Sequence, residues 1–196
     1  MAIYLVTGNK NKLREFEQIL GFKLNHIDLD LDEIQAVDAE EVVEHKVREA
    51  YQKISARGGS RQRAGKKSVL VEDTGLYFEA WNGLPGALIK LFGQAVGYRN
   101  LPRLLKKNRR AKAKTVIGYF DGKNYKNFIG EISGTISKSP KGKTNFGWDI
   151  IFIPKGNRRT FAQMTAEEKN KISMRKVALE KLRKFLGHYS NFGPND

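Results

Sequence analysis

Four short stretches of this sequence carry residue types that could do chemistry. The first is TGNKNK, where an apolar run over residues 2–6 ends in a small polar turn with lysines at positions 10 and 12. Unpaired N–H groups make a helix start electropositive, so lysines there oppose the helix dipole. We therefore expect an anion such as a polyphosphate at this turn, with a simple strand-to-helix turn as the alternative. The longer glycine-rich loop of a Walker motif is absent.

The second stretch is VEDTG, residues 71–75, which places two adjacent carboxylates after a short apolar strand predicted at 69–71. Open α/β sheets bind their ligands beyond the carboxyl ends of strands. Neighbouring side chains on extended backbone point to opposite sides, so one acid could hold a metal while the other faces a water. A polar turn with Gly75 at positive φ is the alternative. We set an aspartic-protease site aside, because it needs two Asp-Thr-Gly loops from two lobes or two chains and only one copy exists here. An acid directly before the Asp would also perturb the shared proton.

The last two stretches lie toward the C-terminus. FGWD, residues 146–149, alternates two aromatic residues with a glycine and an acid, which suits either a packed core or a flat ligand stacked on one ring. In EEKNKISMR, residues 167–175, Lys169 and Arg175 stand near the start of a predicted helix. They could reach a ligand or only solvate the helix surface.

The elements predicted to position these stretches mix strands and helices. In the first half, apolar periodicity and turn residues indicate a strand at 2–6, a helix ending at Gly21, a strand at 24–34, a helix after Asp38 and a strand at 69–71. In the second half they indicate a helical stretch from Pro85, a hairpin over 115–137 turning at Asp121-Gly122, a loop running into a strand over 146–154, and one long helix from the Thr165/Glu168 capping box to Leu186. This order predicts an α/β fold with a mixed sheet.

Composition limits the class of protein. The 196 residues suit one domain, 1–196, that is large enough to form a core without a disulfide or a structural metal. The chain has no cysteine, which fits a cytoplasmic setting. No apolar stretch approaches the 18 residues of a membrane span, so we expect no membrane association. The net charge of +15 favours anionic ligands.

The charge also raises a rival hypothesis, a basic nucleic-acid-binding protein. Residues 57–67 hold five cations and residues 99–114 hold eight, with no acid in either run. Single-strand binding requires aromatic residues among the cations, and both runs lack them, so nucleic acid is the less favoured partner. Solvated faces and a flexible loop are the simpler interpretation of both runs.

In this order and spacing, the four stretches resemble the inosine triphosphate pyrophosphatase family from Ile3 to about Leu186. TGNKNKLREF is similar to the family's opening T-G-N-x-x-K-[LV]-x-E, and VEDTGLYFEAWNGLPGALIKLF to its central block. FGWD and FAQMTAEEKNKIS-x-R match its C-terminal blocks. Two features depart: the 57–67 stretch looks like an insertion, and Met174 replaces the usual His before Arg175.

The resemblance implies an elongated mixed β-sheet with flanking helices, two lobes around a substrate groove and a homodimer. It implies magnesium-dependent hydrolysis of purine nucleoside triphosphates (ITP, dITP, XTP) to a monophosphate and pyrophosphate. Asp73 matches the general base, and Glu33, Glu72 and Asp73 match the metal ligands, with Glu41 and Glu44 competing for the place of Glu33. The remaining substrate-binding matches are Thr7, Gly8, Asn9, Lys10, Asn11, Lys12, Lys46, Thr74, Lys90 and Lys169, with Phe146, Gly147, Trp148, Asp149, Ser173, Met174 and Arg175 around the base.

Overall fold

The computed structural model of this chain describes residues 2–57, 67–144 and 146–187, so residues 58–66 of the basic stretch lie outside it. Within these ranges the chain forms a seven-stranded sheet in the order β2-β1-β3-β5-β6-β7, with β4 paired to β3. The strands are β1 (Ala2–Val6), β2 (Asn25–Ile27), β3 (Lys67–Phe78), β4 (Pro85–Gly86), β5 (Arg110–Phe120), β6 (Tyr125–Ile136) and β7 (Phe152–Pro154). Because β1 is parallel to β2 and β3 while the other pairs are antiparallel, the predicted mixed sheet is confirmed.

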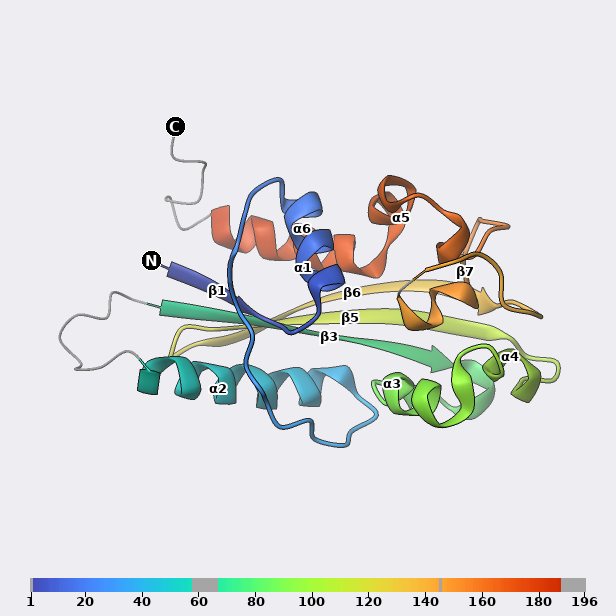
Figure 1. Ribbon diagram of the computed structural model, residues 1–196, viewed down its shortest axis with the longest axis horizontal. Helices are drawn as coiled ribbons and strands as arrows, with labels where there is room; N and C mark the ends of the chain where they lie inside the picture. Colours follow the sequence, from blue (N-terminus) through green and yellow to red (C-terminus); the bar gives the residue numbers. More distant parts are fainter. Residues whose placement is uncertain (1, 58–66, 145, 188–196) are drawn as a thin grey trace.

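Helices cover both faces of this elongated sheet (Figure 1). They are α1 (Lys10–Leu20), α2 (Ala39–Arg57), α3 (Ile89–Phe92), α4 (Leu101–Leu104), α5 (Ala166–Ile172) and α6 (Met174–Gly187), with 3-10 turns at Glu79–Trp81, Gly147–Ile150 and Phe161–Gln163 and a π-helical turn at Gly93–Gly97. Phe16 of α1 and Leu179 of α6 share one core cluster, whereas Val43 of α2 packs with Val71 in another. No helix in the described part of the chain combines the length and apolarity that a membrane span requires.

The predicted hairpin is present and consists of the long strands β5 and β6. β5 pairs with β6 along its whole length, and the Asp121 carboxylate accepts hydrogen bonds from the backbone N–H groups of Lys123 and Asn124. Gly122 has φ of 91°, a conformation that side chains with a Cβ disfavour. A turn encoded within four residues therefore joins the two long strands.

The prediction that the strand at 69–71 ends at Glu72 is wrong. β3 runs through VEDTG to Phe78, and each residue of that stretch pairs with β5, from Val71 opposite Gly118 to Gly75 opposite Lys114. Gly75 has no positive φ, so the turn alternative is wrong as well. The polar residues are extended because a long antiparallel neighbour satisfies their backbone hydrogen bonds.

Three other element boundaries also differ from the predictions. The strand expected at 24–34 covers only β2, and the helical stretch expected from Pro85 begins at α3, since Pro85 itself pairs with β3. The hairpin expected over 115–137 begins at Arg110, so the basic run 99–114 forms α4 and the first part of β5.

The C-terminal region forms two helices instead of one. The capping box at Thr165 and Glu168 is confirmed and starts α5. The chain then becomes extended at Ser173, with ψ of 155°, and α6 starts at the next residue. The Ser173 hydroxyl accepts a hydrogen bond from the backbone N–H of Lys176 in the first turn of α6. The break directs Ile172 to the surface and Arg175 into the interior.

Candidate active site

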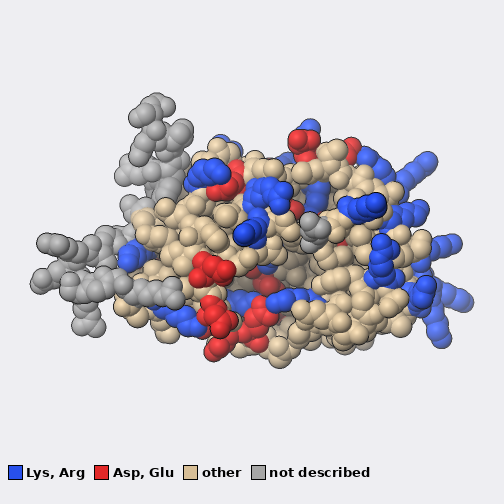
Figure 2. All heavy atoms as spheres, in the orientation of Figure 1, with Lys and Arg blue, Asp and Glu red and all other residues tan. Residues whose placement is uncertain are grey.

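A cleft of about 1270 Å³ collects most of the residues predicted to do chemistry. Its walls are the turn before α1, the loop between β2 and α2, the middle of β3, and the segments at 87–91 and 146–148. The predicted residues that line it are Thr7, Gly8, Asn9, Lys10, Lys12, Glu33, Lys46, Glu72, Asp73, Thr74, Lys90, Phe146, Gly147 and Trp148. Acidic side chains gather near the middle of the face in Figure 2, over the loop between β2 and α2.

The TGNKNK turn is built by its own side chains. The Asn9 side chain caps α1 by accepting hydrogen bonds from the N–H groups of Asn11 and Lys12, and the Thr7 hydroxyl accepts one from the N–H of Asn9. The first turn of α1 contains no acid. A Cβ on Gly8 would stand 2.8 Å from a carboxylate oxygen of Asp28, so glycine permits the acidic loop to approach the turn.

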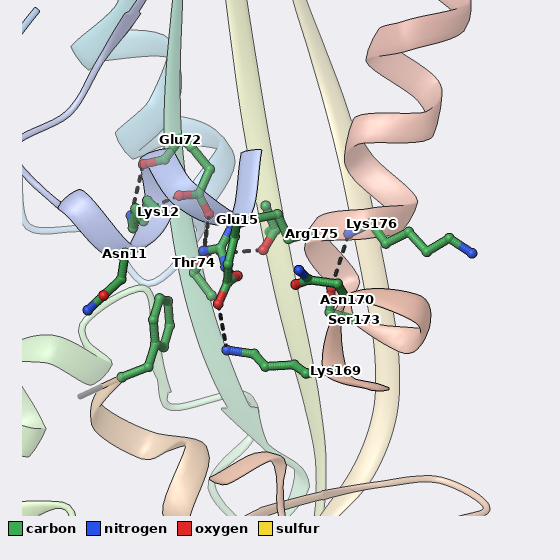
Figure 3. Close-up of polar contacts among 12 residues, drawn as sticks. Asn11, Lys12, Glu15, Glu72, Thr74, Lys169, Asn170, Ser173, Arg175 and Lys176 are labelled. Carbon is green, nitrogen blue, oxygen red and sulfur yellow. Dashed lines mark hydrogen bonds and ion pairs between the residues drawn. The ribbon is translucent and has the colours of Figure 1, made fainter. Parts of the chain in front are cut away.

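Glu72 and Asp73 point to opposite faces of β3, as their adjacency predicts. Glu72 faces α1 and α6, where Lys12 Nζ lies 3.0 Å from its Oε2 and Arg175 Nη2 lies 3.0 Å from its Oε1 (Figure 3). The Thr74 hydroxyl donates a hydrogen bond to the same carboxylate. Burial raises the pKa of Glu72, but the neighbouring charges of Arg175 and Lys12 outweigh it and bring the pKa to about 2.

Asp73 faces α2 and a group of lysines. Lys46 Nζ lies 3.9 Å from Asp73 Oδ1 and 3.2 Å from Glu33 Oε1, and Lys90 Nζ lies 3.2 Å from Glu33 Oε2. Burial raises the pKa of Asp73, and the charges of Lys12 and Lys46 only partly offset it. Two carboxylates thus meet at one ammonium group on the wall of the cleft.

The acids proposed as metal ligands are brought together only in part. Glu33 and Asp73 share Lys46, while Glu72 is held by cations on the other face of the strand. Among the residues that the structure describes, no three acidic or histidine side chains form a group that could hold a metal by themselves. Of the competing acids, Glu44 pairs with Arg48, and neither Glu41 nor Glu44 lines the cleft.

Some of the residues predicted around the base form a charged cluster at the edge of the cleft. Asp149 is buried, with Oδ2 at 2.6 Å from Lys169 Nζ, and its Oδ1 has no hydrogen-bond partner among the residues that the structure describes. Burial raises the pKa of Asp149 to about 6, although Lys169 opposes that change. The ring of Phe146 lies over two cations, at 4.2 Å from Lys169 Nζ and 5.1 Å from Arg175 Cζ.

Several predicted residues do not line the cleft. They are Asn11, Asp149, Lys169, Ser173, Met174 and Arg175. Met174 is fully buried and packs in the core cluster that contains Phe152 and Phe161. Trp148 lines the cleft but also packs edge-to-face on Phe152.

Two residues near the site were not singled out from the sequence. Tyr98 lines the cleft and lies against Gly147, where an added Cβ would stand 2.9 Å from its ring. Glu15 pairs with both Lys169 and Arg175. Its position one helical turn after Lys12, inside the quoted TGNKNKLREF, is the signal that could have identified it.

Comparison with known proteins agrees with this geometry. Residues 3–185 match the model of the Ham1 family. The chain is 43% identical to an inosine triphosphate pyrophosphatase of Kluyveromyces lactis (94% of this chain and 95% of that one) and 36% identical to a dITP/XTP pyrophosphatase of Methanopyrus kandleri (97% of each). A HAM1 protein from Coxiella burnetii has a similar structure, with a TM-score of 0.77 at 25% identity over 96% of this chain and all of that one. A cleft that joins a cationic turn to paired acids on the central strand, in a sequence so similar to these, places this chain in the Ham1 family.

Proposed function

We propose that this protein hydrolyses the non-canonical purine nucleoside triphosphates ITP, dITP and XTP to the monophosphate and pyrophosphate, as a cytoplasmic homodimer. The main observation behind the proposal is that the cationic TGNKNK turn and Asp73 line the same cleft. The names of the Kluyveromyces lactis and Methanopyrus kandleri relatives support the same substrates. The test is a pyrophosphate-release screen of the four canonical triphosphates together with ITP and XTP in the presence of magnesium.

The phosphate end of the substrate would lie along the turn before α1. Lys10, Lys12, Lys46 and Lys90 all line the cleft and supply positive charge, and Thr7 and Asn9 shape the turn. Glu33 and Asp73 would hold magnesium, since Mg²⁺ commonly uses one or two carboxylates together with substrate phosphates. The ion would supply charge neutralisation on the triphosphate. Glu72 fits this role less well, because it is buried on the side of β3 that faces α1 and α6, whereas Glu33 and Asp73 meet at Lys46.

Asp73 would accept a proton from the water that attacks the α-phosphorus, and pyrophosphate would leave toward the lysines. Asp73 would act as a base through its position next to this water, because a carboxylate beside a metal ion keeps a low pKa. The lysines neutralise the charge that develops on the departing pyrophosphate.

Asp149 would select the base. An ionised carboxylate accepts hydrogen bonds only, and hypoxanthine N1 carries a hydrogen whereas adenine N1 does not. Oδ1 of Asp149, which has no partner within residues 2–57, 67–144 and 146–187, would be the acceptor, while Lys169 holds Oδ2. Adenine would leave that buried oxygen unpaired, and such mismatches support discrimination of about 10⁴. Phe146 would stack on the base.

The base selectivity should depend on pH. The pKa of Asp149 is about 6, so about nine-tenths of this carboxylate is protonated at pH 5 and almost none at pH 8. A protonated carboxyl can donate to adenine N1. We expect the ITP/ATP ratio of kcat/KM to fall about tenfold from pH 8 to pH 5, and in Asp149→Asn to be low and independent of pH. A constant ratio in the wild type would remove Asp149 from base recognition.

The two lysines of the turn should differ when replaced. Lys10→Ala and Lys12→Ala should each raise the KM for ITP about tenfold, because each removes a charged contact to phosphate, while binding of inosine changes less than twofold. Only Lys12→Ala should also lower the melting temperature, since Lys12 pairs with buried Glu72 and the Lys10 side chain has no ion-pair partner among the described residues. Equal losses of ITP and inosine binding would place these lysines away from the phosphates.

A further inference from the structure

Four charged side chains form a series of three ion pairs that begins and ends on α1 and passes through β3 and α6; we call this series the charged ring. Lys12 pairs with Glu72, Glu72 pairs with Arg175, and Arg175 Nη1 pairs with Glu15. Lys12 and Glu15 stand three residues apart on α1, so the helix backbone joins the two ends of the series (Figure 3). The positive and negative groups alternate around it.

The ring is buried, and this makes its geometry restrictive. The side chain of Arg175 is 0% exposed and that of Glu72 is 1% exposed, while those of Glu15 and Lys12 are 14% and 16% exposed. Water therefore cannot replace a lost partner of Arg175, and the cation stays where its two carboxylates place it.

Glu15 also extends the ring toward the proposed base pocket. Its Oε1 lies 3.0 Å from Lys169 Nζ, and Lys169 in turn holds Asp149 at 2.6 Å. Both cations that lie under the Phe146 ring, Lys169 and Arg175, are thus bound by the one carboxylate of Glu15. In the described part of the chain, no other acid bridges these two cations.

We propose that Glu15 is a positioning residue that sets the base pocket in register with the phosphate-binding turn. The start of helix α1 carries the proposed phosphate contacts. One turn later the same helix carries Glu15, whose carboxylate binds Lys169 and Arg175. The distance between the two halves of the substrate site is then fixed by the rigid rise of one helical turn. This inference rests on the proposed function, because it assumes a purine triphosphate that spans both halves.

The test is Glu15→Gln, which keeps the shape of the side chain but turns one acceptor into a donor facing a cation. We expect the ITP/ATP ratio of kcat/KM to fall about tenfold or more through a higher KM for ITP, because the variant loses one charge-assisted contact. The kcat for ITP should change less than threefold, because Asp73 faces the other side of β3. Inhibition by inorganic tripolyphosphate, which has no base, should change less than twofold.

Glu17→Gln is the matched control, since Glu17 lies on the same helix and binds Lys23 and the backbone N–H of Leu24 instead. It should leave all of these quantities at wild-type values. Glu15→Asp is the substitute test if Glu15→Gln does not fold. It keeps the charge with a shorter side chain, and we expect its ITP/ATP ratio of kcat/KM to fall at least threefold.

The outcomes separate the two hypotheses. If the wild type releases no pyrophosphate from ITP, the proposed function is wrong and the positioning role of Glu15 falls with it. If the wild type is active but the Glu15 variants keep the ITP/ATP ratio, only the positioning role is wrong. The positioning role would also be wrong if Glu15→Gln weakened inhibition by tripolyphosphate as strongly as it weakened the binding of ITP. The substitution would then have disturbed α1 as a whole.

Discussion

Asp73→Asn should lower kcat for ITP hydrolysis about 10²- to 10⁴-fold while leaving KM within about threefold of the wild-type value. That is the usual contribution of a positioned general base, and asparagine keeps the size of the side chain but cannot accept the proton. Binding should survive, because the lysines that would hold the triphosphate remain. The measurement is steady-state pyrophosphate release at saturating magnesium, together with binding of ITP to the variant by calorimetry.

Two comparisons make the assignment of Asp73 specific. Glu44→Gln removes a carboxylate that pairs with Arg48 outside the cleft and should leave kcat unchanged. Glu33→Gln should raise the magnesium concentration needed for half-maximal rate, and its kcat should be recovered largely at high magnesium. If Asp73→Asn keeps near-normal turnover, another group takes the proton.

Arg175→Leu should reduce the free energy of unfolding by about 3–5 kcal/mol, the usual cost of leaving a buried charge without its partner. Arg175 is fully buried, and its removal leaves Glu72 with Lys12 as its remaining cation. Glu15 keeps only Lys169. Urea unfolding at pH 7, followed by tryptophan fluorescence, measures this loss.

The double variant Glu72→Leu/Arg175→Leu separates the charge from the packing. It removes both members of the pair, so its loss should be smaller than the sum of the two single losses by at least about 1 kcal/mol. The effect of pH gives a second signature. The pKa of Glu72 is lowered from 4.5 to about 2, so its contribution is present above pH 4.5 and is lost as the pH falls toward 2. In Arg175→Leu, the free energy of unfolding should fall less between pH 4.5 and pH 2 than it does in the wild type. If the losses of the two single variants at pH 7 simply add up in the double variant, Glu72 and Arg175 are not coupled.

The parts of the fold that the sequence alone determines are those whose signals lie within a few residues. The Asp121-Gly122 turn and the Thr165/Glu168 capping box satisfy their hydrogen bonds within four residues. The turn before α1 is also local, because Asn9 caps its own helix. The order of strands and helices, and most residues of the cleft, follow from such signals and from the family motifs.

The tertiary structure alone decides which charges meet. Glu72 and Asp73 are adjacent in the sequence, yet one is neutralised by Lys12 and Arg175 and the other faces Lys46. The partners of Glu72 lie 60 and 103 residues away, and Glu15 and Arg175 are separated by 160.

The same holds for boundaries that depend on packing. β3 continues through VEDTG because β5 pairs with every residue of it, and the break at Ser173 lets Arg175 enter the interior while Met174 joins the core. Local propensity contains no information about a partner strand or a buried counter-ion far along the chain. These features are therefore set by the free energy of burial and pairing in the assembled fold, which no short stretch of residues specifies.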